Sequence, residues 1–477
     1  MGKGLGRNEM MILETKLEEI FFLKIKMGFF SRSKNKTATA PSLQTDVAQT
    51  QTAASTPKPE RESSRLGSLF MGDRVIWVVF FFLCIISLVE VYSAASTLAY
   101  KSGRFWEPLV KQAVFLGVGT FIVIIVHRMP CRWFKAFPLF MWTLSVIMLI
   151  CTLFSGAATN DASRWISFLG IQFQPSEIAK GAVVITVALI LSRTQTPTGT
   201  NRKAMKYILS LSLIPILLIF PENLSTAALL FGVVILMMFI GRVPLVQLGK
   251  LFGVLALIGL VVGLLVAISP QVGFLHRLET WKGRIEEHFV GGEEAKQNED
   301  PRTYDIDKKA QVAHANIAIV SSNIIGRMPG NSVQRDFLSQ AFSDFIFAVI
   351  IEEMGIWGAA IVVFLYIILL FRAGRIASRC ERNFPPFLAM GLTLLLVSQA
   401  MLNMWVAVGL FPVTGQPLPL ISRGGTSTLI NCFYIGMILS VSRYAKQVKE
   451  PQHTQFDGPM NDIKHTEERR KVKVKAK

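Results

Sequence analysis

One carboxylate stands at the start of a long apolar run. In the sequence AFSDFIFAVIIEEMG, residues 341–355, Asp344 precedes an apolar run, and Ser343 could cap the helix that this run forms. A carboxylate at the mouth of an apolar helix could be a functional group. It could equally do no more than stabilise the first turn, where the helix-end amide groups favour negative charge. Both interpretations fit the local sequence.

Two further carboxylates, Glu352 and Glu353, lie deeper in the same run. A helix rises about 1.5 Å per residue, which places Glu352 about 12 Å beyond Asp344. Paired catalytic carboxylates of glycoside hydrolases lie only roughly 5–9.5 Å apart. We therefore expect Glu352 and Glu353 to be buried structural carboxylates with basic partners, or to support a neighbouring side chain.

The composition is that of a membrane protein. Of the 477 residues, 51% are hydrophobic and 17% are charged, and apolar runs of spanning length recur from Val75 to Val441. The formal charge of +18 is concentrated in the tails and short loops, as expected of cytoplasmic anchors near anionic membrane lipids, so nucleic acid is not implied. The five cysteines show no metal-ligand spacing, and a disulfide framework is not expected.

Hydropathy predicts an all-α polytopic membrane protein with ten membrane helices. The predicted intervals are 75–95, 108–126, 136–154, 177–192, 204–220, 224–241, 247–268, 344–372, 386–410 and 424–443. Short loops rich in Arg and Lys alternate along the chain with short loops that carry few of them. Because basic loops favour the cytoplasmic side, this pattern predicts that both termini are cytoplasmic. We expect residues 1–74 and 444–477 to be basic cytoplasmic tails, the first disordered, and residues 75–443 to form the membrane domain. No cleavable signal peptide is expected, and Met27 is an alternative start to Met1.

Four polar or irregular stretches fall on the external side in this topology, namely 160–177, 221–227, 341–347 and 412–431. The large loop 269–343 between the seventh and eighth helices lies on the same side. The last stretch is interrupted by Pro412, Gly415, Pro417, Pro419, Gly424 and Gly425, and cannot be regular helix. Irregular backbone at membrane depth must be buried in protein or line a cavity, so we expect it to line a cavity beside Asp344. The alternative is an ordinary external turn.

The motifs in these stretches resemble the SEDS (shape, elongation, division and sporulation) family, the polytopic glycosyltransferases of bacterial cell-wall synthesis. The resemblance covers roughly residues 75–444 and rests on Arg164-Trp165-Ile166, Gln174-Pro175-Ser176-Glu177, Asn331-Ser332 with Gln334, Ser343 to Phe347 with Glu352, Glu353 and Gly355, and residues 412–427. TGQPLPLISRGGTS and VYSAASTLAYK resemble the division proteins (FtsW) more than the elongation proteins (RodA).

The chain departs from the family pattern at two positions of interest. PENLSTA stands where the family commonly has Pro-Asp-x-Gly-Thr, so either Glu222 or Asn223 could occupy the acidic position. Arg423 replaces the usual Tyr, which adds a cation and a further candidate for a phosphate contact.

The resemblance implies polymerisation of lipid II, an undecaprenyl-diphosphate-linked disaccharide peptide, at the division septum of the bacterial cytoplasmic (inner) membrane. Inverting transfer needs one base, and Asp344 matches the family's essential Asp. The implied partners are a class B penicillin-binding transpeptidase, divisome proteins and membrane lipids. A divalent cation, Mg²⁺ or Mn²⁺, could accompany the diphosphate, although no ligand cluster is evident. The alternatives are a lipid II flippase, a non-enzymatic divisome scaffold and a RodA-like elongation polymerase.

Several other residues become candidates for the same site. Lys111 could pair with Asp344 or contact a phosphate, or it could be a lysine that reaches the membrane surface. The candidate substrate contacts are Lys111, Arg164, Gln174, Ser176, Glu177, Gln334, Ser422, Arg423, Gly424, Gly425 and Ser427. The candidate supporting residues are Glu352, Glu353, Pro417 and Pro419.

Overall fold

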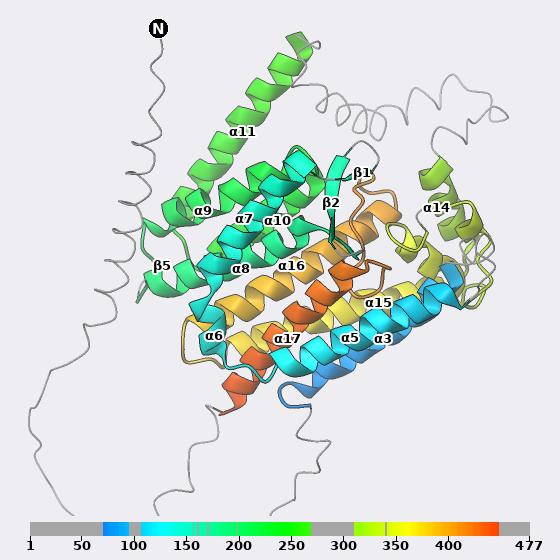
Figure 1. Cartoon of the computed structure of the whole chain (residues 1–477). Helices are drawn as coiled ribbons and strands as arrows, with labels where there is room; N and C mark the ends of the chain where they lie inside the picture. Colours follow the sequence, from blue (N-terminus) through cyan, green and yellow to red (C-terminus); the bar gives the residue numbers. More distant parts are fainter. Residues whose placement is uncertain are drawn as a thin grey trace, which may run out of the picture. The chain divides into compact units, whose positions relative to one another are not determined.

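The computed structural model describes residues 70–94, 106–155, 157–159, 162–168, 171–197, 199–268, 310–338 and 341–447. This part of the chain is mostly helical (Figure 1). Its helices are α3 (Arg74–Ala94), α5 (Glu107–Val126), α6 (Cys131–Ala136), α7 (Pro138–Ser155), α8 (Pro175–Thr194), α9 (Ala204–Ile219), α10 (Leu224–Ile240), α11 (Leu245–Ile268), α14 (Ala310–Ser321), α15 (Ile346–Ala377), α16 (Phe384–Ala407) and α17 (Thr426–Gln447).

The helices have the character of membrane spans. Among the described residues, five helices are long and apolar enough to cross a bilayer, namely α3, α5, α8, α15 and α16. Shorter apolar helices lie within α7, α9, α10 and α11. Large apolar side chains such as Phe121 and Phe364 are about 60% exposed, as expected of helices that face lipid. The chain is therefore a multi-pass membrane protein. Nine of the ten intervals predicted from hydropathy overlap one of these helices, and the tenth, 424–443, overlaps α17, which is not among them.

The prediction of a purely helical protein is wrong in detail. Strands β1 (Ala157–Thr159), β2 (Ala162–Phe168) and β3 (Ile171–Phe173) form a small antiparallel sheet in which Ile166 pairs with Phe173. Strand β2 packs against α7 and α8, so the stretch folds back on the helices. The residues ASRWISF include the aromatic and β-branched types that favour strands. A second pair, β4 (Gln195–Thr196) and β5 (Gly199–Thr200), follows α8.

Helices α15, α16 and α17 lie side by side in the middle of the described bundle (Figure 1). Helix α16 packs on α15, α8, α10 and α17, while α17 packs on α5. Small residues allow these close approaches. At Gly119 of α5 an added Cβ would lie 2.5 Å from the sulfur of Cys432 on α17.

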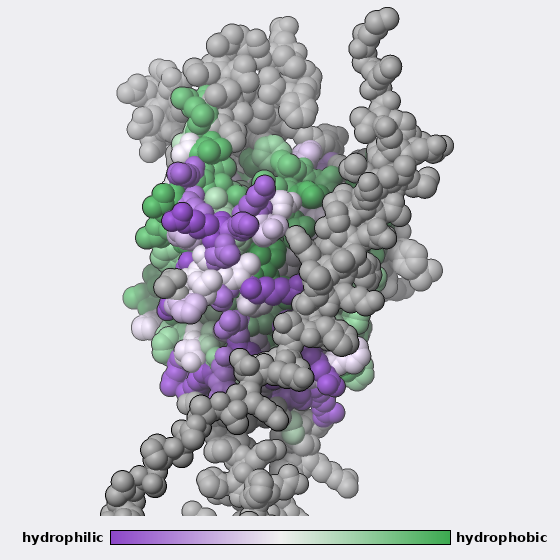
Figure 2. All heavy atoms as spheres, turned by 90° about the vertical axis from the view of Figure 1, so that its left-hand side faces the viewer, coloured by the Kyte–Doolittle hydropathy of each residue, from purple (hydrophilic) through white to green (hydrophobic). Residues whose placement is uncertain are grey.

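The basic loops gather at one end of the bundle. There the guanidinium of Arg443 donates to the carbonyl of Arg128, and Arg372 forms an ion pair with Asp73. Figure 2 shows hydrophilic residues gathered on the face that looks out from α6 and β5, with hydrophobic residues along its flanks. These contacts bring the start of α3 together with the ends of α5, α15 and α17. The charge bias of the loops predicts that these four helix ends lie on the same side of the membrane.

Candidate active site

Asp344 lies just before α15 and not within it. The helix begins at Ile346, Phe345 is the N-cap, and no side chain caps it. The prediction that Ser343 caps the helix with Asp344 in its first turn is therefore wrong. The Ser343 hydroxyl instead donates to Oδ1 of Asp344 over 3.0 Å.

The irregular stretch predicted from its prolines and glycines lies directly beside Asp344. The backbone amide of Arg423 donates to the carbonyl of Phe342 over 2.9 Å, and the Ser422 hydroxyl donates to the carbonyl of Ser343 over 2.6 Å. Nδ2 of Asn403, on α16, donates both to the carbonyl of Asp344 at 2.9 Å and to that of Gln416 at 2.7 Å. Residues 408–425 contain no helix, so the prediction of irregular structure beside Asp344 is confirmed.

A buried ion pair joins the first turn of α8 to the same stretch. Nζ of Lys180 lies 2.7 Å from Oε1 of Glu177, and both side chains are at most 2% exposed. Lys180 also donates to Oε1 of Gln399 over 2.8 Å, and Nε2 of Gln399 donates to the carbonyl of Pro417 over 3.2 Å. The hydroxyl of Tyr434 donates to the carbonyl of Glu177. Charges buried in this way persist only when they are paired and hydrogen-bonded.

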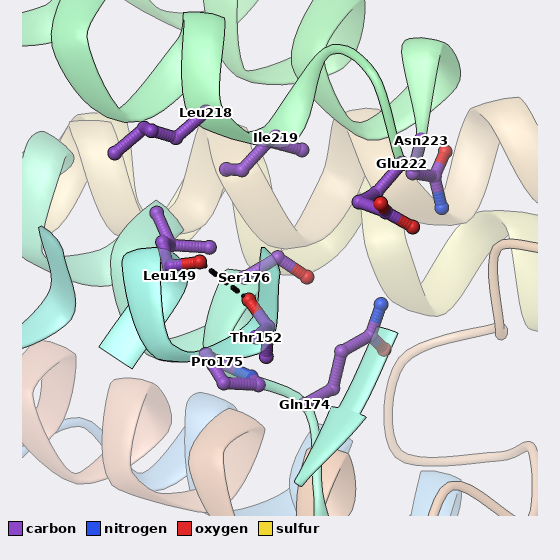
Figure 3. A pocket seen from close by; sticks show the side chains of 9 residues that line it. All are labelled: Leu149, Thr152, Gln174, Pro175, Ser176, Leu218, Ile219, Glu222 and Asn223. Atoms are coloured by element: carbon purple, nitrogen blue, oxygen red, sulfur yellow. Dashed lines mark hydrogen bonds between the residues drawn. The ribbon is translucent and has the colours of Figure 1, made fainter. Parts of the chain in front are cut away.

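The stretch that begins PENLSTA is tied to the same network. Oδ1 of Asn223 accepts the amide of Thr226 over 3.1 Å and caps α10, while Nε2 of Gln416 donates to the Thr226 hydroxyl over 2.6 Å. A small cleft lies between this turn and the first turn of α8 (Figure 3). Gln174 and Ser176 line one side, and Glu222 and Asn223 line the other. The four polar or irregular stretches therefore meet in one hydrogen-bonded assembly.

The candidate cations lie at the edge of this assembly. Lys111 is 54% exposed and pairs with Glu107 over 2.5 Å, so Glu107 is the partner that the structure supplies in place of Asp344. The guanidinium of Arg423 lies 5.3 Å from the ring centre of Phe342. Burial lowers the pKa of Arg423 from its usual value, and the charge of Glu107 acts in the opposite direction. Arg164 lies in β2, and its side chain is outside the described part.

The remaining candidates of the irregular stretch shape its backbone. The carbonyl of Pro419 accepts a hydrogen bond from the hydroxyl of Tyr366 on α15. The amide of Ser427, in the first turn of α17, donates to the carbonyl of Gly424 over 3.0 Å. Gly425 has a φ of 52°, in the region that favours glycine. The carbonyl of Pro417 accepts the hydrogen bond from Nε2 of Gln399 described above.

Glu352 and Glu353 hold a loop in place and lie away from this network. Both are fully buried, with Arg327 and Arg335 each 3.6 Å from one of them, as predicted for structural carboxylates. Glu352 accepts the amide of Val333 at 3.0 Å, and Glu353 accepts the amide of Gly330 at 3.1 Å. Gln334 belongs to this loop, where Oε1 lies 2.8 Å from Nδ1 of His314. Gln334 is thus joined to Glu352 and α14.

Three polar residues of the network were missed from the sequence, namely Lys180, Gln399 and Asn403. A signal existed for Lys180, because a charge inside an apolar helix marks a functional or paired position. Gln399 and Asn403 are one helical turn apart on α16 and share a face. Within the described residues, no group of three or more His, Cys, Asp or Glu could hold a metal ion.

Comparison with known proteins identifies the family. Residues 73–447 match the family model FtsW/RodA/SpoVE, described as cell cycle protein. The probable peptidoglycan glycosyltransferase FtsW of Nitrosomonas europaea is 31% identical over 366 residues, which is 75% of this chain and 89% of the relative. The peptidoglycan glycosyltransferase MrdB of Escherichia coli K12 is 28% identical over 370 residues, 77% of this chain and 94% of the relative.

Solved structures share the fold. One is a chain of the structure "Structural coordination of polymerization and crosslinking by a peptidoglycan synthase complex", with a TM-score of 0.62 and 23% identity over 79% of this chain and 99% of that chain. The rod shape determining protein RodA of Thermus thermophilus has a TM-score of 0.54 and 23% identity over 78% of this chain and 97% of that one. The chain therefore belongs to the FtsW/RodA/SpoVE family, which is the SEDS family that its motifs resemble.

Proposed function

We propose that this chain is a peptidoglycan glycosyltransferase that polymerises lipid II into glycan strands during bacterial cell division. The observation that carries the proposal is the convergence of four separate stretches around Asp344, through Asn403, Ser422, Gln399 and Gln416. The curated relatives carry the same activity in their names. The division role follows from the two stretches that resemble FtsW more than RodA.

Asp344 is the general base of the proposed reaction. Its carboxylate takes the proton of the acceptor's 4-hydroxyl while that oxygen bonds to the donor's anomeric carbon. The bond from this carbon to the diphosphate breaks at the same time, and the undecaprenyl diphosphate leaves with the electron pair. The hydroxyl of Ser343, 3.0 Å from Oδ1, orients the carboxylate. One base is sufficient because the diphosphate leaves without a proton donor.

The leaving diphosphate needs positive charge. Arg423 is the first candidate, because its backbone is bonded to Phe342, two residues before Asp344. Lys111 and Arg164 are the others, whereas Lys180 is fully buried and acts through Gln399 on the irregular stretch. A divalent cation, Mg²⁺ or Mn²⁺, would arrive with the diphosphate and neutralise its charge.

The proposed setting is the cytoplasmic membrane at the division septum. Ten helices cross the membrane, both termini are cytoplasmic, and residues 269–343 are external. The gathering of basic loops at one end of the bundle supports this orientation. The proposed partner is a class B penicillin-binding transpeptidase, supported by the resemblance in fold to a chain of a complex named for polymerization and crosslinking. Other divisome proteins would join the same assembly.

The deciding experiment is polymerisation of labelled lipid II by the purified protein, with and without its transpeptidase. Asp344→Asn should abolish polymer, because loss of a general base costs a factor of about 10² to 10⁴. Its melting temperature in detergent should change little, because Asn keeps the shape of Asp and can still accept the hydrogen bond of the Ser343 hydroxyl. Asp336→Asn, at a half-exposed carboxylate of the same loop region, is the matched control and should remain active. Near wild-type polymerisation by Asp344→Asn would remove the catalytic assignment of Asp344, whereas absence of polymer from the wild-type protein with its transpeptidase would leave a scaffold or flippase.

A further inference from the structure

The small cleft of Figure 3 lies where four helix ends meet, namely the ends of α7 and α9 and the starts of α8 and α10. It has a volume of about 20 Å³, which is room for a water molecule or for one small substituent of a larger ligand. One part of its wall is apolar and comprises Leu149, Pro175, Leu218 and Ile219. The other part is polar and comprises Thr152, Gln174, Ser176, Glu222 and Asn223.

Two side chains of the polar wall carry buried atoms that no other described residue satisfies with a hydrogen bond. The atoms are Oγ of Ser176 and Nδ2 of Asn223, and these residues are only 7% and 6% exposed. The orientation of the Asn223 amide is fixed, because its Oδ1 accepts the backbone amide of Thr226 and caps α10. Nδ2 of Asn223 is therefore a buried donor that needs an acceptor. In contrast, the hydroxyl of Thr152 already donates to the carbonyl of Leu149.

This combination of atoms fits a neutral amide that carries a methyl group. The carbonyl oxygen of the amide would accept from Nδ2 of Asn223, and its N–H would donate to the hydroxyl of Ser176. The methyl group would pack against Leu218 and Ile219. An anion fits poorly, because Glu222 lines the cleft and none of the described residues that line it is Lys or Arg.

Three side chains connect the cleft to the proposed base. The hydroxyl of Thr226, whose amide is bonded to Asn223, accepts from Nε2 of Gln416 over 2.6 Å. Nδ2 of Asn403 donates both to the carbonyl of Gln416 and to that of Asp344. The cleft and Asp344 therefore belong to one hydrogen-bonded frame, and a sugar that reacts at Asp344 can direct a ring substituent toward the cleft.

We propose that this cleft binds the acetamido group of a sugar in the lipid-linked substrate. The proposal rests on the proposed function, which supplies the disaccharide. Both sugars of lipid II carry an acetamido group, so the chemistry is shared by the donor ring and the acceptor ring. The cleft would select such sugars over those with a hydroxyl on the same carbon, because a hydroxyl is too short to reach the buried donor of Asn223 and leaves it unpaired. An ordered water is the competing occupant.

The test is binding of lipid II to the full-length protein with its transpeptidase in nanodiscs, measured by competition with fluorescent lipid II. Two analogues carry a hydroxyl in place of one acetamido group, either on the sugar bonded to the diphosphate or on the terminal sugar. One of them should bind the wild-type protein at least about tenfold more weakly than lipid II, because it leaves a buried donor unpaired. The analogue that is affected identifies which sugar enters the cleft.

Two variants of the cleft should each lose most of this preference, namely Ser176→Ala and, independently, Asn223→Ser. They should bind lipid II more weakly and the affected analogue as the wild-type protein does. Asn223→Ser removes the amide donor but keeps a residue that can cap α10. The matched controls are Ser210→Ala and Asn201→Ser, at exposed side chains that bond their own local backbone and do not line the cleft. Both controls should keep the wild-type preference.

Two results would overturn the proposal. One is equal binding of lipid II and both analogues by the wild-type protein. The other is an unchanged preference in both folded cleft variants, which is the result expected if the cleft holds only an ordered water. Polymerisation assays keep these outcomes separate from the proposed function. A wild-type protein that prefers lipid II to the analogue but makes no polymer would contradict the proposed function and leave the acetamido site standing, whereas polymerisation without any preference would do the reverse.

Discussion

The hydroxyl of Ser422 lies 2.6 Å from the carbonyl oxygen of Ser343, the residue immediately before Asp344. The hydroxyl oxygen of Ser422 also accepts the backbone amide of Leu418 over 2.8 Å. One buried hydroxyl thus fixes the irregular stretch to itself and to the backbone that carries the proposed base. Because residues 408–425 contain no helix, such side-chain bonds have to supply the order that helical hydrogen bonds supply elsewhere.

Ser422→Ala should lower the rate of polymerisation more than it lowers stability. The buried partners left unsatisfied cost about 1–3 kcal/mol of stability. A small displacement of Asp344 should reduce kcat about tenfold or more with little change in the KM for lipid II. Ser192→Ala is the control, because that hydroxyl bonds only the preceding turn of α8. A loss of stability with unchanged kcat would show that Ser422 is structural and does not position the base.

Lys180→Met should destabilise the fold strongly. It leaves the carboxylate of Glu177 buried without its cation, at a cost of about 3–5 kcal/mol. The melting temperature in detergent should fall by several degrees, and Glu177→Gln combined with Lys180→Met should recover much of that loss. Lys203→Met, at an exposed loop lysine, should change stability by less than about 0.5 kcal/mol. Equal melting of the single and double variants would argue against a coupled pair.

Gly355→Ala should destabilise α15 at its kink. Gly355 has a φ of 68°, and an added Cβ would lie 2.5 Å from the carbonyl oxygen of Ile324. The loop at Arg327 and Met328 donates its amides there to the carbonyls of Glu352 and Glu353. Gly374→Ala on the same helix meets no atom within 4 Å and should be neutral or stabilising by about 1 kcal/mol. The melting temperatures of the two alanine variants test this prediction. Equal melting temperatures would refute the close backbone contact at Gly355.

Labelling of single cysteines tests the membrane orientation. In a background without the five native cysteines, Gln297→Cys should react with an impermeant maleimide from outside the cell, and Ser55→Cys only after the membrane is opened. Both positions lie outside the described residues, so the prediction rests on the charge bias of the loops. Reversed labelling would place Asp344 on the cytoplasmic side and contradict the proposed function.

The sequence alone was sufficient to locate the long apolar helices and the irregular stretch, although α6 and α14 were not predicted. Hydropathy is a property of contiguous residues, so α5 and α16 could be placed to within a few residues. The prolines and glycines of residues 412–425 exclude a helix in any tertiary setting. The pairing of Glu352 and Glu353 with basic residues was also predictable, because charges inside an apolar run need partners.

Only the tertiary structure decided which polar groups meet. Lys180 and Gln399 are 219 positions apart, and their bond depends on how α8 packs against α16. Lys111 pairs with Glu107 on its own helix. Its charge and its predicted depth in the membrane were equally compatible with Asp344 as the partner, and only the side-chain positions distinguish the two carboxylates. The N-cap at Phe345 and the small sheet β1–β3 were missed for the same reason. The local sequence permits a cap at Ser343 and strands in the β1–β3 region. Contacts with distant segments determine whether the cap or the strands form.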